Sequence, residues 1–371
     1  MRTLAFICLL VSLLQVNAQS ADNLFQQGMH LYTAGDYGGA VTVFELYLEK
    51  YPSKVGVWYQ LALAKKGAGD LKGALTAIDE AVAAAPQSEE YFYQRGLILF
   101  DLQQYESAAL DFTKCIEINF LSYRGYLYRG VCYYNLQLND KALSDYNDAL
   151  KLNPGSPEAH YYRAILYREN KEYDAALVDL DTALILNTTY FEAVLERANL
   201  FFDMQKTAAA LQDYDRYLSK ITFDDAAFNN RGLAKSKVGD HAGAIEDFTS
   251  AIAIDSTVAA YYYNRAGDRM MIKDYANSIE DYSRALELDP GYRNALFFRG
   301  KVKFKLGNFD ACVADMELLL AKYPNDLEAK ELKSSAESRS FIAKNWLYLL
   351  ALALLIVNGI FLIRRRNRAK A

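Results

Sequence analysis

Small and large apolar residues follow one another along this chain in a pattern that repeats every 34 residues. Nine copies occur without an insertion, and the first begins at Ala21. Position 8 of each copy is glycine or alanine: Gly28, Ala62, Gly96, Gly130, Ala164, Ala198, Gly232, Ala266 and Gly300. Position 20 is alanine in seven copies and Ser278 or Cys312 in the last two. Position 24 is large and mostly aromatic: Phe44, Ile78, Phe112, Tyr146, Leu180, Tyr214, Phe248, Tyr282 and Met316.

This spacing predicts two helices in each copy. Positions 4, 8 and 11 share one helical face, as do positions 20, 24 and 27. Small residues at positions 8 and 20 allow the helices to approach closely, and the large residue at position 24 fills the space beside them. Turn sequences such as Ala34-Gly35-Asp36 separate the helices, and proline at position 32 ends the second helix in five copies. One such hairpin cannot bury its own apolar faces, so nine copies are expected to stack into a solenoid.

The pattern resembles the tetratricopeptide repeat family. The family signature W-L-G-Y…A…F…A…P is clearest in the second copy, at Trp58, Leu61, Ala62, Ala74 and Pro86. The copies that carry the resemblance cover residues 21–326. The resemblance implies an all-α fold: a right-handed superhelical solenoid of nine helix-turn-helix repeats, whose first helices line a concave groove.

The two ends of the chain have a different character. Residues 1–18 combine Arg2, a short apolar run and small residues at Val16 and Ala18, which is the pattern of a secretory signal peptide cleaved after Ala18. Residues 346–363 are uncharged and apolar, and as a helix they would be about 27 Å long, enough to span a membrane. The positive-inside rule places the basic tail, residues 364–371, in the cytoplasm and the repeats outside it.

The predicted organisation is therefore a signal peptide at 1–18, nine repeats at 19–326, a capping helix and juxtamembrane spacer at 327–345, a transmembrane helix at 346–363 and a cytoplasmic tail at 364–371. A processed C-terminal sorting signal, as in bacterial surface proteins, is the alternative for the last two segments. No LPxTG or PEP motif precedes them.

A pair of opposite charges accompanies the last seven copies. Position 7 is arginine and position 23 is aspartate in these copies, and both charges are missing from the first two. Their joint occurrence suggests that they contact each other. Pairing within a copy leaves no charge over, whereas pairing each aspartate with the next copy's arginine leaves Arg95 alone and makes Lys333 available to Asp315. We favour the pair within a copy and interpret it as structural, since an active site would not be copied seven times.

The resemblance places positions 2, 5, 9 and 12 of the first helix on the groove, and their spacing forms one helical stripe. Here the stripe is aromatic and aliphatic, most continuously in the first five copies. Apolar surface of this extent is typical of interaction sites. The predicted partner-binding residues are Phe25, Met29, Tyr32, Tyr59, Leu63, Tyr93, Leu97, Phe100, Tyr134, Tyr161, Phe202, Tyr263 and Phe297.

The net charge, the cysteines and the histidines limit the kinds of function that the chain can have. The net charge of −5 offers no general attraction to nucleic acid. Cys8, Cys115, Cys132 and Cys312 lack metal-ligand spacing, and His30, His160 and His241 occupy different repeat positions. No catalytic motif interrupts the repeats. We therefore expect no enzyme, no catalytic residue, no metal, no cofactor and no small-molecule substrate.

The sequence favours a membrane-tethered, extracytoplasmic scaffold, periplasmic if bacterial, that binds a protein or extended peptide in the groove and acts in envelope assembly or secretion. A saccharide- or cell-wall-binding protein that stacks sugars on the tyrosines is the alternative. The family's carboxylate clamp for chaperone C-termini is not expected, because only Asn199 and Asn229 resemble its groove residues and the topology excludes a cytosolic partner.

Overall fold

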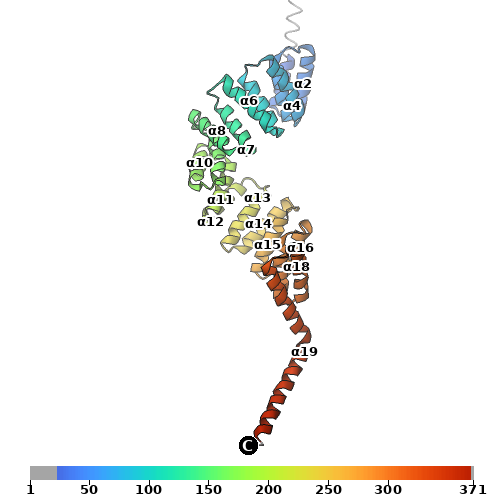
Figure 1. The fold of residues 1–371 in the computed structure, drawn as a ribbon. Helices are drawn as coiled ribbons and strands as arrows, with labels where there is room; N and C mark the ends of the chain where they lie inside the picture. The colour runs from blue at the N-terminus through green and yellow to red at the C-terminus, as the bar shows by residue number, and fades with distance from the viewer. Residues whose placement is uncertain (1–22, 369–371) are drawn as a thin grey trace, which may run out of the picture. The chain divides into compact units, whose positions relative to one another are not determined.

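The computed structural model describes residues 23–368, so the predicted signal peptide at 1–18 and the last three residues lie outside the described residues. The described range is helical and contains no strand (Figure 1). The chain divides after Ala193 into two compact units. We call them the N-terminal unit, which holds repeats 1–5, and the C-terminal unit, which holds repeats 6–9 and the last helix.

Each repeat consists of a helix A and a helix B. Helix A covers positions 1–13 in repeats 2–9, and helix B covers positions 17–30 except in repeat 6, where it ends at position 28. The A helices are residues 23–33, α3 (Val55–Gly67), α5 (Glu89–Asp101), α7 (Tyr123–Asn135), α9 (Pro157–Glu169), α11 (Phe191–Asp203), α13 (Asp225–Lys237), α15 (Ala259–Met271) and α17 (Arg293–Lys305). The B helices are α2 (Tyr37–Lys50), α4 (Leu71–Ala84), α6 (Tyr105–Ile118), α8 (Asn139–Leu152), α10 (Tyr173–Leu186), α12 (Thr207–Leu218), α14 (His241–Ile254), α16 (Tyr275–Leu288) and α18 (Phe309–Lys322). The chain ends in α19 (Leu327–Arg368).

Consecutive helices pack in pairs inside each unit. Helix A packs on helix B of its own repeat, and helix B packs on helix A of the next repeat. The predicted all-α fold of stacked hairpins is confirmed, and the helix boundaries recur with the same 34-residue period as the sequence.

The contact between positions 8 and 24 fixes each hairpin. Phe44 and Phe112 are fully buried, and their rings lie directly against the backbone of the glycine at position 8. A Cβ added to Gly28 would stand 2.5 Å from Phe44 Cε1, and one added to Gly96 would stand 2.8 Å from Phe112 Cε1. Both distances are shorter than van der Waals contact, so the ring at position 24 excludes a side chain at position 8 in these repeats.

The turn between helix A and helix B, which we call the A–B turn, requires a left-handed backbone at position 15 in every repeat. The residues with positive φ there are Gly35, Gly69, Gln103, Gln137, Lys171, Gln205, Gly239, Lys273 and Gly307. Glycine adopts this conformation without strain, whereas for a residue with a Cβ the conformation costs about 1–2 kcal/mol of free energy. Five repeats therefore carry a small strain in this turn.

We expect Gln103→Gly to raise the free energy of unfolding by about 0.5–1 kcal/mol, because it removes the strain of a φ of 60°. Urea unfolding of the repeat fragment 19–344 measures this. The reciprocal control is Gly69→Gln, where φ is 83° and no atom lies within 4 Å of an added Cβ. A stabilising Gly69→Gln would contradict the strain account.

The predicted arginine–aspartate pair forms within each of the last seven repeats. In repeat 4, Arg129 Nε donates to Asp145 Oδ2 and Arg129 Nη2 donates to Asp145 Oδ1, both at 2.8 Å. The same two-bonded contact joins the other six pairs: Arg95–Asp111, Arg163–Asp179, Arg197–Asp213, Arg231–Asp247, Arg265–Asp281 and Arg299–Asp315. Burial raises the pKa of the Asp145 carboxyl, and the hydrogen bonds from Arg129 oppose that effect. The favoured register is confirmed.

The remaining nitrogen of these arginines reaches back to the preceding repeat. Arg129 Nη1 donates to Thr113 Oγ1 at 3.3 Å, and Arg163 Nη1 donates to Asn147 Oδ1 at 2.7 Å. The acceptor stands at position 25, where every copy has a side chain that can accept: Glu45, Asp79, Thr113, Asn147, Asp181, Asp215, Thr249, Ser283 and Glu317. The sequence treated pairing within and between copies as alternatives. The structure shows the pair within a copy, and the contact between copies uses the position-25 side chain instead of the aspartate.

We expect Arg129→Ala and Asp145→Ala to show a coupling energy of about 1–3 kcal/mol in a double-mutant cycle, because Asp145 is buried and each single change leaves a charge without its partner. Urea unfolding of fragment 19–344 again provides the measurement. The exposed pair Lys114–Glu117 in helix α6 is the matched control, with an expected coupling below about 0.5 kcal/mol. Equal coupling at the two sites would show that burial does not strengthen the pair.

Helix α19 begins as a tenth helix A. Its first residue stands 34 residues after the start of α17, and Ala329 and Ala336 are buried against the last repeat. Lys333 stands at position 7 of this helix and contacts Glu317 at 3.0 Å. Glu317 is the position-25 residue of repeat 9, so the partner of Lys333 is Glu317 and not Asp315. The predicted capping helix and the predicted membrane helix are one continuous helix (Figure 1). Among the described residues, it is the one helix long and apolar enough to cross a membrane.

Candidate functional site

The predicted groove residues lie on the A helices and divide into pocket-lining and packing residues. All except Tyr93 are partly exposed. Phe25 and Tyr59 line one pocket of the N-terminal unit, and Tyr263 lines one of the C-terminal unit. The other predicted residues contact neighbouring side chains, as described below, and their role in binding stays a prediction.

The pocket of the N-terminal unit lies across the N-terminal ends of the first A helices. Its volume is about 530 Å³. Phe25, Tyr47, Tyr59 and Tyr91 form its aromatic walls, and Lys54 supplies a positive charge. The complete lining is Phe25, Tyr47, Ser53, Lys54, Val55, Gly56, Val57, Tyr59, Gln60 and Tyr91. Of these, sequence reasoning had named Phe25 and Tyr59. Tyr91 and Tyr47 stand at positions 3 and 27, outside the expected stripe, so spacing alone could not find them.

Tyr59 is held in place by its surroundings. Its ring lies 5.0 Å from that of Tyr91, and its hydroxyl donates to Glu90 Oε1 at 3.1 Å. Burial raises the pKa of Tyr59, and the Glu90 carboxylate raises it further, so the hydroxyl stays a donor at neutral pH. Glu90 also accepts from Gln94 and from Arg124. The Tyr59 hydroxyl and the Glu90 carboxylate are therefore already hydrogen-bonded, whereas Lys54 and Gln60 also line the pocket.

Tyr93 belongs to the packing of the groove floor. It is only 8% exposed, and its ring contacts those of Phe112 and Tyr128 at centroid distances of 6.0 and 5.6 Å. The Arg124 guanidinium covers the ring at 4.4 Å. This burial leaves little of Tyr93 for a partner, although it occupies the same repeat position as Tyr59.

The other stripe residues of the N-terminal unit brace hairpins and repeat junctions. Tyr32 and Phe100 each meet a tyrosine of their own helix B, Tyr37 and Tyr105, edge to face. Met29 and Leu97 pack against the buried core, and Leu63 is partly buried. Tyr161 lies between Tyr162 and Tyr190, and the Tyr134 hydroxyl donates to Glu169.

The C-terminal unit has a smaller pocket of about 260 Å³ around Tyr263. Leu233, Asn264, Met270 and Phe298 are among the residues that line it. The predicted residues Phe202 and Phe297 do not line this pocket. Phe202 lies beneath Lys237, and Phe297 contacts Phe298 at a centroid distance of 5.4 Å.

Asparagine side chains on the A helices of the C-terminal unit contact one another. Asn264 Nδ2 donates to Asn229 Oδ1 at 2.8 Å, and Asn230 Nδ2 donates to Asn199 Oδ1 at 3.2 Å. Tyr214 also donates to Asn199. Sequence reasoning considered Asn199 and Asn229 only as a chaperone clamp and missed this network. Its members bond to one another across neighbouring repeats.

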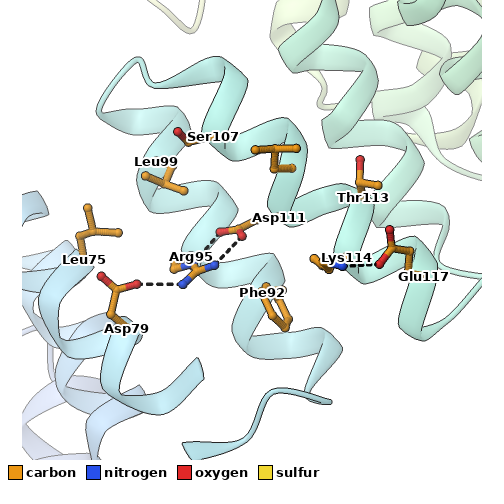
Figure 2. A pocket seen from close by; sticks show the side chains of 11 residues that line it. Leu75, Asp79, Phe92, Arg95, Leu99, Ser107, Asp111, Thr113, Lys114 and Glu117 are labelled. Atoms are coloured by element: carbon orange, nitrogen blue, oxygen red, sulfur yellow. Dashed lines mark hydrogen bonds and ion pairs between the residues drawn. The ribbon is translucent and has the colours of Figure 1, made fainter. Parts of the chain in front are cut away.

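A further pocket, of about 560 Å³, lies between helices α4, α5 and α6 and was not predicted (Figure 2). It contains Arg95, which bonds both to Asp111 and to Asp79 of the preceding repeat. The exposed side chain of Leu110, at 69%, forms its apolar rim with Leu75 and Leu99. The charges in this pocket are internally paired, so its recognition surface is aliphatic.

The three described cysteines are buried, and His160 and His241 are paired with carboxylates. Cys115, Cys132 and Cys312 are buried, and burial raises the pKa of each thiol, to about 12, 12 and 11. His160 contacts Asp179. Burial raises the pKa of the Asp179 carboxyl, but hydrogen bonds from Arg163 and His160 outweigh this effect, so the pKa is lowered. Within residues 23–368 no group of three or more His, Cys, Asp or Glu side chains is arranged to hold a metal ion.

Comparison with known proteins agrees with this architecture. The tetratricopeptide repeat family model matches residues 59–116 and 129–190. No curated protein matches the sequence. Among solved structures, the C-terminal part of a repeat-containing protein from Cytophaga hutchinsonii is similar with a TM-score of 0.53 and 19% identity, over 65% of this chain and 98% of that one.

Two other solved structures are similar at the level of the fold. The pilF protein of Pseudomonas aeruginosa has a TM-score of 0.51 and 17% identity, over 57% of this chain and 97% of that one. The APC/C hetero-tetramer Cut9-Hcn1 has a TM-score of 0.52 and 14% identity, over 85% of this chain and 76% of the matched chain.

Tyr93→Ala should lower the free energy of unfolding by about 3–5 kcal/mol, because it empties a buried aromatic site. Tyr59→Ala, at the partly exposed equivalent position, should cost less than about 2 kcal/mol. Urea unfolding of fragment 19–344 followed by circular dichroism compares the two changes. If the two losses were equal, Tyr59 would be a packing residue like Tyr93.

Proposed function

Because the chain is a tetratricopeptide repeat protein, with the architecture of a protein-interaction scaffold, we propose that it binds a protein or extended peptide in the aromatic groove of its N-terminal unit. The observation that carries this proposal is the pocket around Phe25 and Tyr59. Its aromatic walls are open, while the Tyr59 hydroxyl and the Glu90 carboxylate beside them are bonded to each other. Such a surface gains free energy mainly by burying apolar area of a partner.

Aromatic anchors of this kind suit side chains presented from an extended or helical segment. Tyrosines provide a large contact area with few rotatable bonds, and Lys54 at the pocket edge favours a partner that carries an acidic group beside an apolar one. Gln60 offers an amide to the partner's main chain at the same place. The pocket volume of about 530 Å³ accommodates one or two large side chains.

We further propose that the scaffold is tethered to a membrane by the C-terminal part of α19, with the repeats outside the cytoplasm. The supporting features are the apolar segment 346–363, the basic residues after it, and the apolar run with small residues at the N-terminus. A scaffold fixed in this way concentrates its partner at the membrane, which suits a role in envelope assembly or secretion.

The proposed groove is tested by a photo-reactive amino acid introduced at Gln60 in the full-length protein in its native membrane. We expect a discrete cross-linked product at Gln60 and none at Thr76, an exposed position on helix B of the same repeat. Tyr59→Asp should reduce the cross-linked yield at least about tenfold, the equivalent of about 1.4 kcal/mol of lost binding.

Leu110→Asp is the matched control, because Leu110 rims the other apolar pocket of the same unit. The groove assignment would be wrong if Leu110→Asp abolished the product while Tyr59→Asp left it unchanged. Circular dichroism of both variants confirms that neither substitution unfolds the repeats.

A further inference from the structure

We propose that the A–B turn of repeat 9, together with the adjoining turn of α19, forms a second contact with the membrane, at the level of the lipid headgroups. This inference rests on the proposed membrane tether. It assigns an interaction surface to one edge of the C-terminal unit, and its occupant is the surface of the bilayer that α19 enters.

The direction of α19 determines which edge faces the membrane. Every helix A runs toward the A–B turn of its repeat, and α19 packs on the last repeat as a further helix A. The chain therefore continues past the A–B turn edge instead of reversing into a helix B. The membrane must then lie on the side of the A–B turns of the last repeats, and the loops between repeats point away from it.

Two contacts fix the depth of the repeat 9 turn along α19. Ser340 Oγ donates to Asp310 Oδ1 at 2.7 Å, and Lys344 Nζ donates to the same carboxylate at 2.9 Å. Asp310 is the second residue of α18, directly after the turn Leu306-Gly307-Asn308. The turn therefore lies beside residues 340–344, and the apolar segment starts at Trp346.

The rise of a helix converts this spacing into a height. Trp346 stands two positions after Lys344, which corresponds to about 3 Å along the axis. The headgroup layer on each side of a bilayer is about 5–8 Å thick. A turn at the level of residues 340–344 thus falls inside that layer if the apolar segment fills the hydrocarbon core.

The side chains at this edge suit such a location. Leu306, Phe341 and Ile342 are 46%, 60% and 54% exposed, and Lys305 is exposed beside them. Aliphatic and aromatic side chains with lysines that extend to the headgroups are the composition of interfacial contacts. Of the acidic groups at this edge, Asp310 is paired with Lys344, and Asp274 of repeat 8 accepts from Asn277.

The opposite edge of the same repeats is formed by the loops between repeats. These loops contain Asp289-Pro290-Gly291 before repeat 9 and Asn325-Asp326 after it, with Asp326 paired to Arg293 and Leu327 exposed beside it. On the A–B turn edge, exposed Ile272 and Lys273 of repeat 8 continue the pattern of Leu306 and Lys305. The apolar and lysine pairs of two successive turns therefore lie on the edge past which α19 continues.

The test uses full-length protein reconstituted into vesicles of phosphatidylcholine with a minor share of phosphatidylglycerol. Single cysteines at Leu306, Asn325 and Leu350 are labelled with an environment-sensitive fluorophore in a Cys8→Ser background, which is selective because Cys115, Cys132 and Cys312 are buried. A lipid with a nitroxide on its headgroup quenches labels at the interface, and one with a nitroxide in its acyl chain quenches labels in the core. Ile272→Cys is a second reporter on the same edge.

We expect the headgroup nitroxide to quench the Leu306 label at least about twofold more than the Asn325 label, which stands on the opposite edge of repeat 9. The acyl-chain nitroxide should quench the Leu350 label. If Leu350 is quenched while Leu306 and Asn325 respond alike, the second contact is refuted and the tether stands. If Leu350 is not quenched and the protein leaves the vesicles, the tether itself fails and this inference fails with it.

Discussion

The close approach of helix A and helix B at positions 8 and 24 is the constraint on which every repeat depends. A buried ring or aliphatic side chain from helix B lies against the backbone of helix A, so position 8 is restricted to glycine or alanine. Each such side chain contributes about 1.5–3 kcal/mol by burial alone. An inserted residue would rotate one helix face by about 100° and separate these partners, which explains why nine copies keep the same length.

The arginine at position 7 couples one hairpin to the next. It bonds to a buried aspartate of its own repeat, so this aspartate is not left as an unpaired buried charge. It also bonds to the position-25 side chain of the preceding repeat and thereby joins two repeats. Repeats 1 and 2 lack this pair, and Lys65 contacts Glu45 across their junction instead. The aromatic pocket lies in this differently braced end.

Much of this architecture could be predicted from the sequence because the same residue types recur every 34 residues. The helix boundaries, the small residues at position 8 and the partners of Arg129 and Asp145 all follow from position within the repeat. The groove was less predictable. A helical stripe assigns Tyr59 and Tyr93 the same role, but Tyr128 and Phe112 of the surrounding helices bury Tyr93, whereas Tyr59 stays open beside Tyr91. That difference depends on residues outside the stripe. The sequence shows a polar residue at position 25 of every copy. Its partner, the position-7 arginine of the next repeat, is evident only from the packing of neighbouring hairpins.

Helix α19 joins the cap of the last repeat and the proposed membrane tether, which the sequence had divided into two segments. A solenoid needs a final helix with one face that fits the last repeat, and a membrane tether needs an uninterrupted apolar helix. The first half of α19 satisfies the former with the small residues Ala329 and Ala336 and with the Lys333–Glu317 contact. Its second half supplies the apolar segment without an intervening loop. Because a continuous helix transmits rotation and tilt, whatever orients the apolar segment also orients the last repeats. A flexible linker would have left that orientation undefined; here it is a property of the fold of the C-terminal unit.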